Sequence, residues 1–136
     1  MKTAGVPFFV YGTLRSRGRH RRRMKELGGV VIRPCFINGF LLGLKKANSV
    51  RPYVLPYPVT NRVEGELIEF PQEALPKLAQ FERCNSTFPT VSETILSDVV
   101  VYWPGDENNL NLAMAKVYVV GRDIHNVEQI TTEEAL

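Results

Sequence analysis

Apolar and polar positions along the chain predict several short strands. Residues 7–11 begin with a proline, are otherwise aromatic and β-branched, and stop at Gly12, which is typical of a buried strand. Apolar and acidic residues mostly alternate over residues 63–70, as in a strand with one face in water. Similar runs predict strands at residues 30–32, 36–44, 90–103 and 112–120, of which 90–103 forms either one strand or a hairpin.

Two short helices are predicted between these strands. Residues 19–27 have one apolar face and are followed by two glycines, which favour a helix end. Residues 71–81 form a second amphipathic helix that a proline opens. Residues 45–62 are predicted to be a loop because three prolines interrupt them, and Asn38-Gly39 predicts a turn or a bulge.

Length and composition suit a single globular domain. The chain has 136 residues, of which 44% are hydrophobic and 23% charged, so it can bury a core without disulfide or metal support. Together the elements predict an α+β fold dominated by strands. Residues 1–120 are predicted to form the single domain. Residues 121–136 have weak periodicity and are predicted to be a C-terminal tail on the surface.

Positive charge is concentrated in one segment. Residues 15–25 contain no acid and seven basic residues: Arg15, Arg17, Arg19, Arg21, Arg22, Arg23 and Lys25. The other 10 basic residues are outnumbered by 14 acidic ones, so the net charge of +3 comes from this run. Such a run is either a solvated surface or a binding surface for phosphate and other anions. No aromatic residue interleaves the arginines, so base stacking is unsupported and we do not expect a nucleic-acid partner.

Cysteines and histidines are few and widely spaced. Cys35, Cys84, His20 and His125 have no metal-ligand spacing, so we expect neither a metal nor a disulfide framework. The start of the chain does not resemble a signal peptide, and no apolar run approaches the roughly twenty residues of a membrane span. We therefore expect a cytoplasmic protein with free thiols and no membrane partner.

Two segments carry candidate chemistry. Gly12 directly follows a buried strand, where a glycine lets the backbone turn sharply and leaves amide groups to face a carboxylate or an oxyanion. Glu82 follows apolar Phe81 at the end of the second helix, where the helix dipole disfavours a negative charge. Such an acid either exchanges protons near neutral pH or is a surface residue paired with Arg83.

Four segments together resemble the gamma-glutamylcyclotransferase-like family, also known through its AIG2-like members. Phe-Val-Tyr-Gly-Thr-Leu-Arg at residues 9–15 is similar to the opening signature of that family, and residues 63–70 to its middle strand. Residues 78–82 resemble the helix end that carries the catalytic acid, and residues 115–119 the closing strand. The resemblance implies a small mixed, mainly antiparallel β-barrel with two flanking short helices and a pocket beside residues 11–14.

The resemblance also implies a reaction and its residues. A γ-glutamyl amine or γ-glutamyl amino acid would be converted to 5-oxoproline and a free amine or amino acid, without metal or cofactor. Glu82 is the implied general acid and base. The implied substrate-binding residues are Tyr11, Gly12, Thr13, Leu14 and Tyr118, although Tyr118 is equally well read as an ordinary strand aromatic. Tyr57 and Pro58 are further candidates for the same pocket.

Departures from the family pattern keep other functions open. Phe88, Pro89 and Thr90 stand where many members carry a tyrosine and then an arginine, and Ala79 stands where an aspartate is common. A catalytically inactive scaffold that binds a small molecule is therefore the second hypothesis. A nucleic-acid-associated protein acting through residues 15–25 is the third.

Covalent catalysis by a thiol is the last hypothesis. Neither Cys35 nor Cys84 has a histidine nearby in the sequence.

Overall fold

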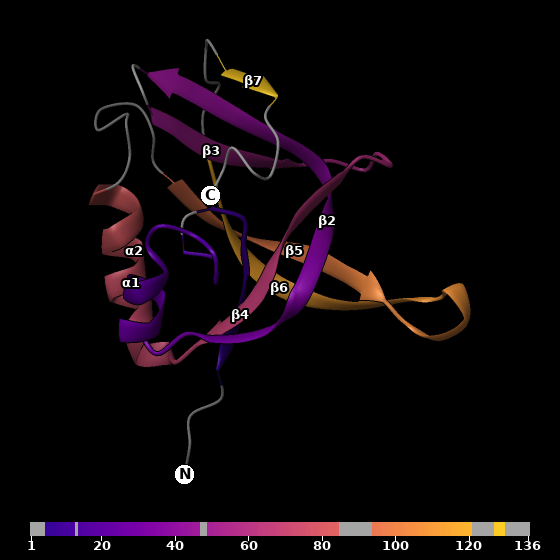
Figure 1. The fold of residues 1–136 in the computed structure, drawn as a ribbon, viewed down its shortest axis with the longest axis horizontal. Coiled ribbons are helices and arrows are strands. Elements are labelled where there is room, and N and C mark those ends of the chain that lie inside the picture. Colours follow the sequence, from indigo (N-terminus) through magenta and orange to yellow (C-terminus); the bar gives the residue numbers. More distant parts are fainter. Residues whose placement is uncertain (1–4, 13, 47–48, 85–93, 121–126, 130–136) are drawn as a thin grey trace.

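The computed structural model describes residues 5–12, 14–46, 49–84, 94–120 and 127–129. Its strands are β1 (Val6–Val10), β2 (Val30–Lys46), β3 (Ser49–Pro56), β4 (Arg62–Phe70), β5 (Thr94–Pro104), β6 (Leu110–Val120) and β7 (Val127–Gln129). Its helices are α1 (Arg21–Glu26) and α2 (Leu75–Cys84), with short 3₁₀ turns η1 (Gln72–Ala74) and η2 (Asp106–Asn108). Both α-helices lie on the same side of the curved sheet (Figure 1).

Five strands close into a barrel of mixed direction. Strand β4 pairs antiparallel with β2 and with β1, β1 pairs parallel with β6, and β6 pairs antiparallel with β5. A pair between Phe36 of β2 and Tyr102 of β5 closes the ring, and β3 extends the sheet beyond β2. The sequence-based prediction of a mixed, mainly antiparallel barrel with two short flanking helices is confirmed.

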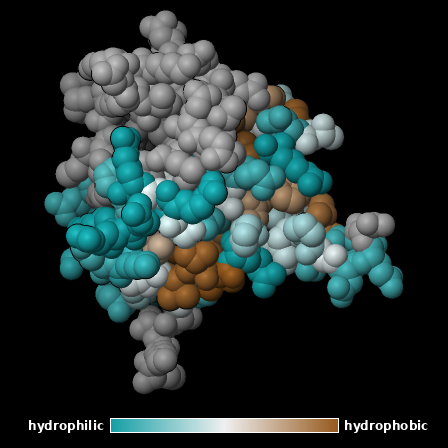
Figure 2. Space-filling view, viewed as in Figure 1, coloured by the Kyte–Doolittle hydropathy of each residue, from teal (hydrophilic) through white to brown (hydrophobic). Residues whose placement is uncertain are grey.

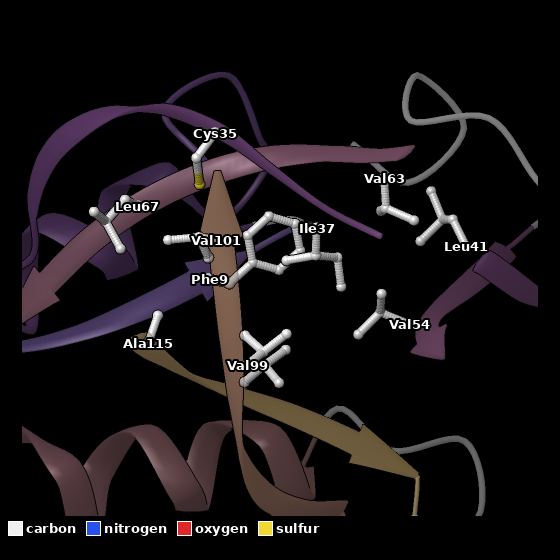
Figure 3. Packing of buried hydrophobic residues seen from close by; sticks show 11 residues of the cluster. Phe9, Cys35, Ile37, Leu41, Val54, Val63, Leu67, Val99, Val101 and Ala115 are labelled. Carbon is white, nitrogen blue, oxygen red and sulfur yellow. The ribbon is translucent and has the colours of Figure 1, made fainter. Parts of the chain in front are cut away.

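Alternating side chains of β1 face two separate cores. Phe9 points into the barrel, where it packs with apolar residues of the other strands (Figure 3). Phe8 points the opposite way, under the helices, because successive residues of a strand face opposite sides. The barrel core consists of Phe9, Cys35, Ile37, Leu41, Val54, Val63, Leu67, Val99, Val101, Ala115 and Val117.

The second core attaches the helices to the barrel. It contains Met24 and Leu27 from the α1 segment, Ala74 and Leu78 from the α2 segment, and Leu14 from the loop after β1. Phe8, Ile68 and Phe70 supply its strand side. Helix α1 ends where Gly28 takes a φ of +83°, with Gly28 N–H donating to the Lys25 carbonyl and Gly29 N–H to that of Met24. The predicted glycine end of this helix is therefore confirmed.

Residues 45–62 are not a loop, contrary to the prediction. Strand β3 occupies Ser49–Pro56 and pairs with β2 from Gly39 to Lys46. Prolines are tolerated here because β3 pairs with no strand other than β2 among the described residues, and an edge strand does not need every backbone N–H for pairing.

The two predicted strands at 30–32 and 36–44 are one long strand. The pairing of β2 with β4 shifts register between Val31 and Arg33, so Ile32 is an inserted bulge residue. At Gly39, whose φ is +152°, β2 changes partner from β4 to β3. The predicted turn or bulge at Asn38-Gly39 is therefore an irregular point inside a continuous strand.

The remaining predicted elements keep their type with adjusted ends. Residues 94–104 form the single strand β5 rather than a hairpin, and the second helix continues to Cys84 after the η1 turn. Within residues 121–136, strand β7 pairs with Leu42, Gly43 and Leu44 of β2.

Candidate functional site

The loop after β1 begins with a tyrosine that reaches the last strand of the barrel. Tyr11 Oη donates a hydrogen bond of 2.9 Å to the backbone carbonyl of Tyr118 on β6. The Tyr11 ring also stacks on Phe9, with 6.0 Å between ring centroids. Two segments that are 107 residues apart are thereby joined at the point where β1 turns into the loop.

Gly12 and Arg15 close a turn that the buried arginine supports. The backbone N–H of Arg15 donates to the Gly12 carbonyl at 3.1 Å, and its Nε donates to the same oxygen at 3.2 Å. The Arg15 side chain is only 7% exposed. Among the described residues, no backbone hydrogen bond uses the amides of Gly12 and Leu14. The turn thus uses its carbonyl internally and leaves amide donors for another acceptor.

A serine and a glutamate fasten the far end of this turn to the barrel. Ser16 donates from its backbone N–H to Glu66 Oε1 and from its Oγ to Glu66 Oε2, both at 2.5 Å. Glu66 lies on β4, opposite Val10 of β1. Hydrogen bonds to a carboxylate are stronger than neutral ones, so this contact fixes the loop against β4. The sequence showed Glu66 only as one polar position of an alternating strand.

Helix α2 presents one face to the same loop. Leu78 is 2% exposed and belongs to the core that also contains Leu14, with Tyr118 packed against it. Positions 78 and 82 are one turn apart, so position 82 stands on that face of α2, in its last turn. The Glu82 side chain and all of Thr13 lie outside the described residues, so their roles remain predictions.

Tyr118 is held in place by an aromatic neighbour. Its ring stacks on Phe8 at a centroid distance of 6.0 Å, and Phe8 in turn meets Phe70 edge-on at 5.6 Å. The structure therefore brings Tyr11, Leu14 and Tyr118 together beside Gly12. Tyr57 is 56% exposed and packs on Phe40, and no described contact joins it to these residues.

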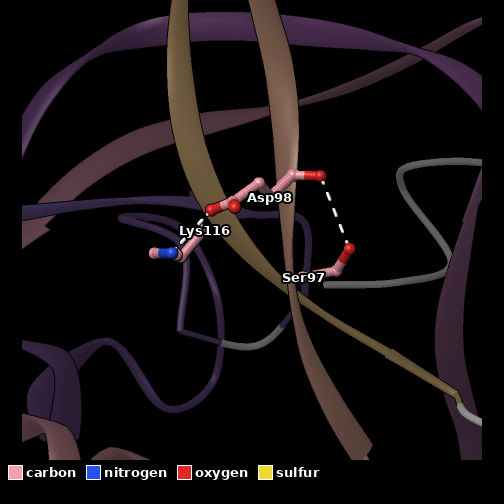
Figure 4. A network of polar contacts seen from close by, with 3 residues as sticks. All are labelled: Ser97, Asp98 and Lys116. Carbon is pink, nitrogen blue, oxygen red and sulfur yellow. Dashed lines mark hydrogen bonds and ion pairs between the residues drawn. The ribbon is translucent and has the colours of Figure 1, made fainter.

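An ion pair borders Tyr118 along the sheet. Lys116 Nζ lies 2.6 Å from Asp98 Oδ1 across the β5–β6 pair, and Ser97 Oγ contacts the Asp98 carbonyl at 3.5 Å (Figure 4). Lys116 and Tyr118 share a strand face because they are two residues apart. Both charges are well exposed, so we expect the pair to contribute little to stability.

The basic run divides into one buried residue and an exposed group. Arg15 is buried, so it does not belong to the solvated surface that is one of the two interpretations of the run. The other residues named in the run, from Arg17 to Lys25, are exposed as a solvated surface would be. Four of them line a surface concavity of about 460 Å³: Arg19, Arg21, Arg22 and Lys25.

Cys35 is a poor candidate for a nucleophile. It is a free thiol buried in the barrel core, and burial raises its pKa to about 12, with Glu64 and Glu66 adding to the effect. A nucleophilic cysteine needs a lowered pKa because the thiolate is the reactive form. The Cys84 side chain lies outside the described residues.

The described residues contain no group of three or more His, Cys, Asp or Glu side chains close enough to hold a metal ion. Within the same part of the chain, no helix has the length and apolar character required to cross a bilayer.

Solved structures with the same fold include three that span most of their own chains. An AIG2-like protein from Mus musculus superposes with a TM-score of 0.66 at 18% identity, covering 89% of this chain and 80% of its own. An uncharacterised protein from Pyrococcus horikoshii gives 0.58 at 18% identity, with coverages of 93% and 86%. A protein specific to uropathogenic Escherichia coli gives 0.61 at 13% identity, with coverages of 98% and 93%. At these identities the likeness concerns the fold.

Sequence comparison identifies the family. No curated protein matches the chain significantly. The family described as gamma-glutamyl cyclotransferase, AIG2-like, matches it over residues 8–134, which includes the loop after β1, helix α2 and strand β6. The chain therefore belongs to the gamma-glutamyl cyclotransferase, AIG2-like family.

Proposed function

We propose that this protein is a gamma-glutamyl cyclotransferase that acts on a γ-glutamyl amine or γ-glutamyl amino acid. The observation that carries the proposal is the family match over residues 8–134, together with the meeting of the loop after β1 with α2 and β6. The products are 5-oxoproline and a free amine or amino acid.

The reaction needs one folded substrate and one proton carrier. The α-amine, once deprotonated, attacks the γ-carbonyl carbon and forms a C–N bond that closes a five-membered ring. The tetrahedral intermediate then expels the original amide nitrogen. Because the attacking and leaving groups belong to one molecule, holding the substrate folded supplies much of the rate.

The turn at residues 12–15 binds the substrate in this proposal. The amides of Gly12 and Leu14 donate to the α-carboxylate or to the oxyanion of the tetrahedral intermediate. Arg15 supports the turn through the Gly12 carbonyl and adds positive charge on its buried side. Tyr11 and Ser16 fix its two ends through Tyr118 and Glu66. A rigid turn of this kind keeps its donors aimed without reorganisation during the reaction.

Glu82 is the proposed general acid and base. Its carboxylate accepts a proton from the attacking nitrogen, and the resulting carboxylic acid returns a proton to the leaving nitrogen, so a single residue serves both steps. Position 82 is on the helix face that Leu78 anchors toward the loop, which supports the assignment.

The test is release of 5-oxoproline from a panel of γ-glutamyl amines and γ-glutamyl amino acids. We expect Glu82→Gln to lower kcat by roughly 100-fold or more, because general acid–base catalysis contributes about that factor. Glu73→Gln is the matched control, since Glu73 is an exposed glutamate of the preceding η1 turn. It should leave kcat unchanged.

Two results would contradict this proposal. Normal turnover by Glu82→Gln would remove Glu82 from the reaction. Absence of 5-oxoproline across the panel, combined with a shift in melting temperature on adding a γ-glutamyl compound, would favour the inactive binding scaffold. The departures at Ala79 and at residues 88–90 would then be the first positions to restore toward the family pattern.

A further inference from the structure

Beyond the proposed reaction, we infer that the surface formed by α1 and the start of β2 docks on an anionic lipid bilayer. Two features of this surface support the inference: a concavity lined by cations and a patch of exposed aliphatic residues beside it. Figure 2 shows an apolar patch directly next to the hydrophilic surface over α1.

The cationic part is dense and nearly free of acids. Arg19, Arg21, Arg22 and Lys25 line the concavity of about 460 Å³. The acid in α1, Glu26, pairs with Arg23 at 3.2 Å. Glu26 therefore does not neutralise the four cations that line the concavity. Among the described contacts, no ion pair joins Arg22 or Lys25 to an acidic residue. A concavity of this charge suits phosphate-containing headgroups.

The apolar part lies at the start of β2, up to the bulge residue Ile32. Val30, Val31 and Ile32 are exposed by 60%, 38% and 39% in succession. Three adjacent aliphatic residues beside a basic helix match the composition of surfaces that bind in the headgroup region.

Charge distinguishes this patch from the other exposed apolar group. Leu110, Leu112 and Met114 on β6 are exposed by 46%, 63% and 56%. They follow η2, which carries Asp106 and Glu107, so an anionic bilayer would repel that region. A soluble polyanion such as RNA accounts for the cations but not for the aliphatic patch, and no aromatic residue is present in the run to stack on bases.

The inference revises the expectation of no membrane partner, which rested on the lack of a spanning segment. Docking of this kind needs no span. It relies on electrostatic attraction within a Debye length and on shallow burial of apolar side chains.

Co-sedimentation with vesicles tests the inference. The protein should bind vesicles of mixed phosphatidylcholine and phosphatidylserine, bind pure phosphatidylcholine much less, and dissociate as salt rises. Arg22→Gln with Lys25→Gln should lower the partition coefficient by about 25-fold, since each basic residue near such a surface contributes about fivefold. Lys77→Gln, an exposed helical lysine on α2, is the charge control and should have little effect.

The apolar contribution is tested separately. Val30→Ser with Ile32→Ser should reduce vesicle binding by about tenfold, whereas Leu110→Ser with Leu112→Ser should not reduce it. Melting curves verify that each variant is folded. Vesicle binding that is absent, or indifferent to Arg22 and Lys25, would overturn the inference. Tight binding of duplex RNA or inorganic phosphate without vesicle binding would also overturn it, because the surface would then bind a soluble anion rather than a bilayer.

Discussion

Gly65 is the glycine whose replacement most directly tests how the barrel positions the loop. It lies on β4, where an added Cβ would stand 2.6 Å from the Val10 carbonyl oxygen and 2.7 Å from the Phe9 ring. Both obstacles belong to β1, the strand that leads into Tyr11 and Gly12. Neither is a flexible side-chain end, because one is backbone and the other is a ring locked in the barrel core.

The magnitude follows from these distances. An ordinary carbon contact needs about 3.5 Å, so Gly65→Ala forces β1 away from β4 by several tenths of an ångström at least. Overpacking of this kind typically costs 1–3 kcal/mol, and we expect about 3 kcal/mol because backbone must move. For a domain of this size the melting temperature should fall by roughly 8–15 °C.

Gly5→Ala is a closely matched control. Its added Cβ would also meet an atom at 2.6 Å, but that atom is Oε1 of Glu69, the end of a flexible carboxylate side chain on the same β4 strand. Rotation of Glu69 moves its carboxylate away and leaves only its Cβ, at 3.1 Å, so the free energy of unfolding should change by about 1 kcal/mol, less than for Gly65→Ala.

Thermal and urea denaturation followed by circular dichroism measure both variants. Equal melting temperatures for Gly65→Ala and Gly5→Ala would refute the reasoning, since the shortest contact of the added Cβ is 2.6 Å in both and only the nature of the neighbouring atom differs. Gly65→Ala should also raise the KM for a γ-glutamyl substrate if the turn at the end of β1 binds the substrate as proposed.

Two further predictions concern Cys35 and Tyr11. Cys35 keeps its proton to a pKa of about 12 when folded but ionises near 9.0 when unfolded, so the folded state binds more protons between these values. The contribution of the thiol to stability is therefore complete below pH 9 and declines above it, by up to about 1.4 kcal/mol per pH unit. Urea denaturation from pH 7 to pH 11 should show a steeper loss of unfolding free energy for the wild type than for Cys35→Ala. Parallel curves for the two proteins would contradict this. Tyr11→Phe removes the hydrogen bond to the Tyr118 carbonyl, which should lower the free energy of unfolding by about 1–2 kcal/mol; an unchanged urea midpoint would show that the contact is not stabilising.

Local sequence pattern was sufficient to predict the elements whose signals lie within their own residues. Strands β1 and β4 and both helices were predicted because aromatic runs, alternation and glycine ends depend on neighbouring residues only. Strand β3 was missed because its prolines indicate a loop in isolation. Only pairing along one edge of β2 explains why they are tolerated.

The candidate site was predictable in its residue types but not in its contacts. The glycine after β1 and the acid at the end of α2 were visible in the sequence. Tyr118 could be interpreted equally well as a substrate-binding residue or as an ordinary strand aromatic. Burial of Arg15 could not be predicted, because a charge in a basic run is ordinarily solvated. The contact of Ser16 with Glu66 depends on the pairing of β1 with β4, which brings residues 50 positions apart together.

Identification of the product formed in ¹⁸O-labelled water tests most directly the central claim, which is that the substrate's own amine is the nucleophile. A γ-glutamyl amine should yield 5-oxoproline without solvent oxygen, because the nucleophile is the substrate's own amine, and Glu82→Gln should slow this release by roughly 100-fold or more. Glutamate that carries solvent oxygen would show hydrolysis by water instead. That product, or release of 5-oxoproline at the same rate by Glu82→Gln, would contradict the account.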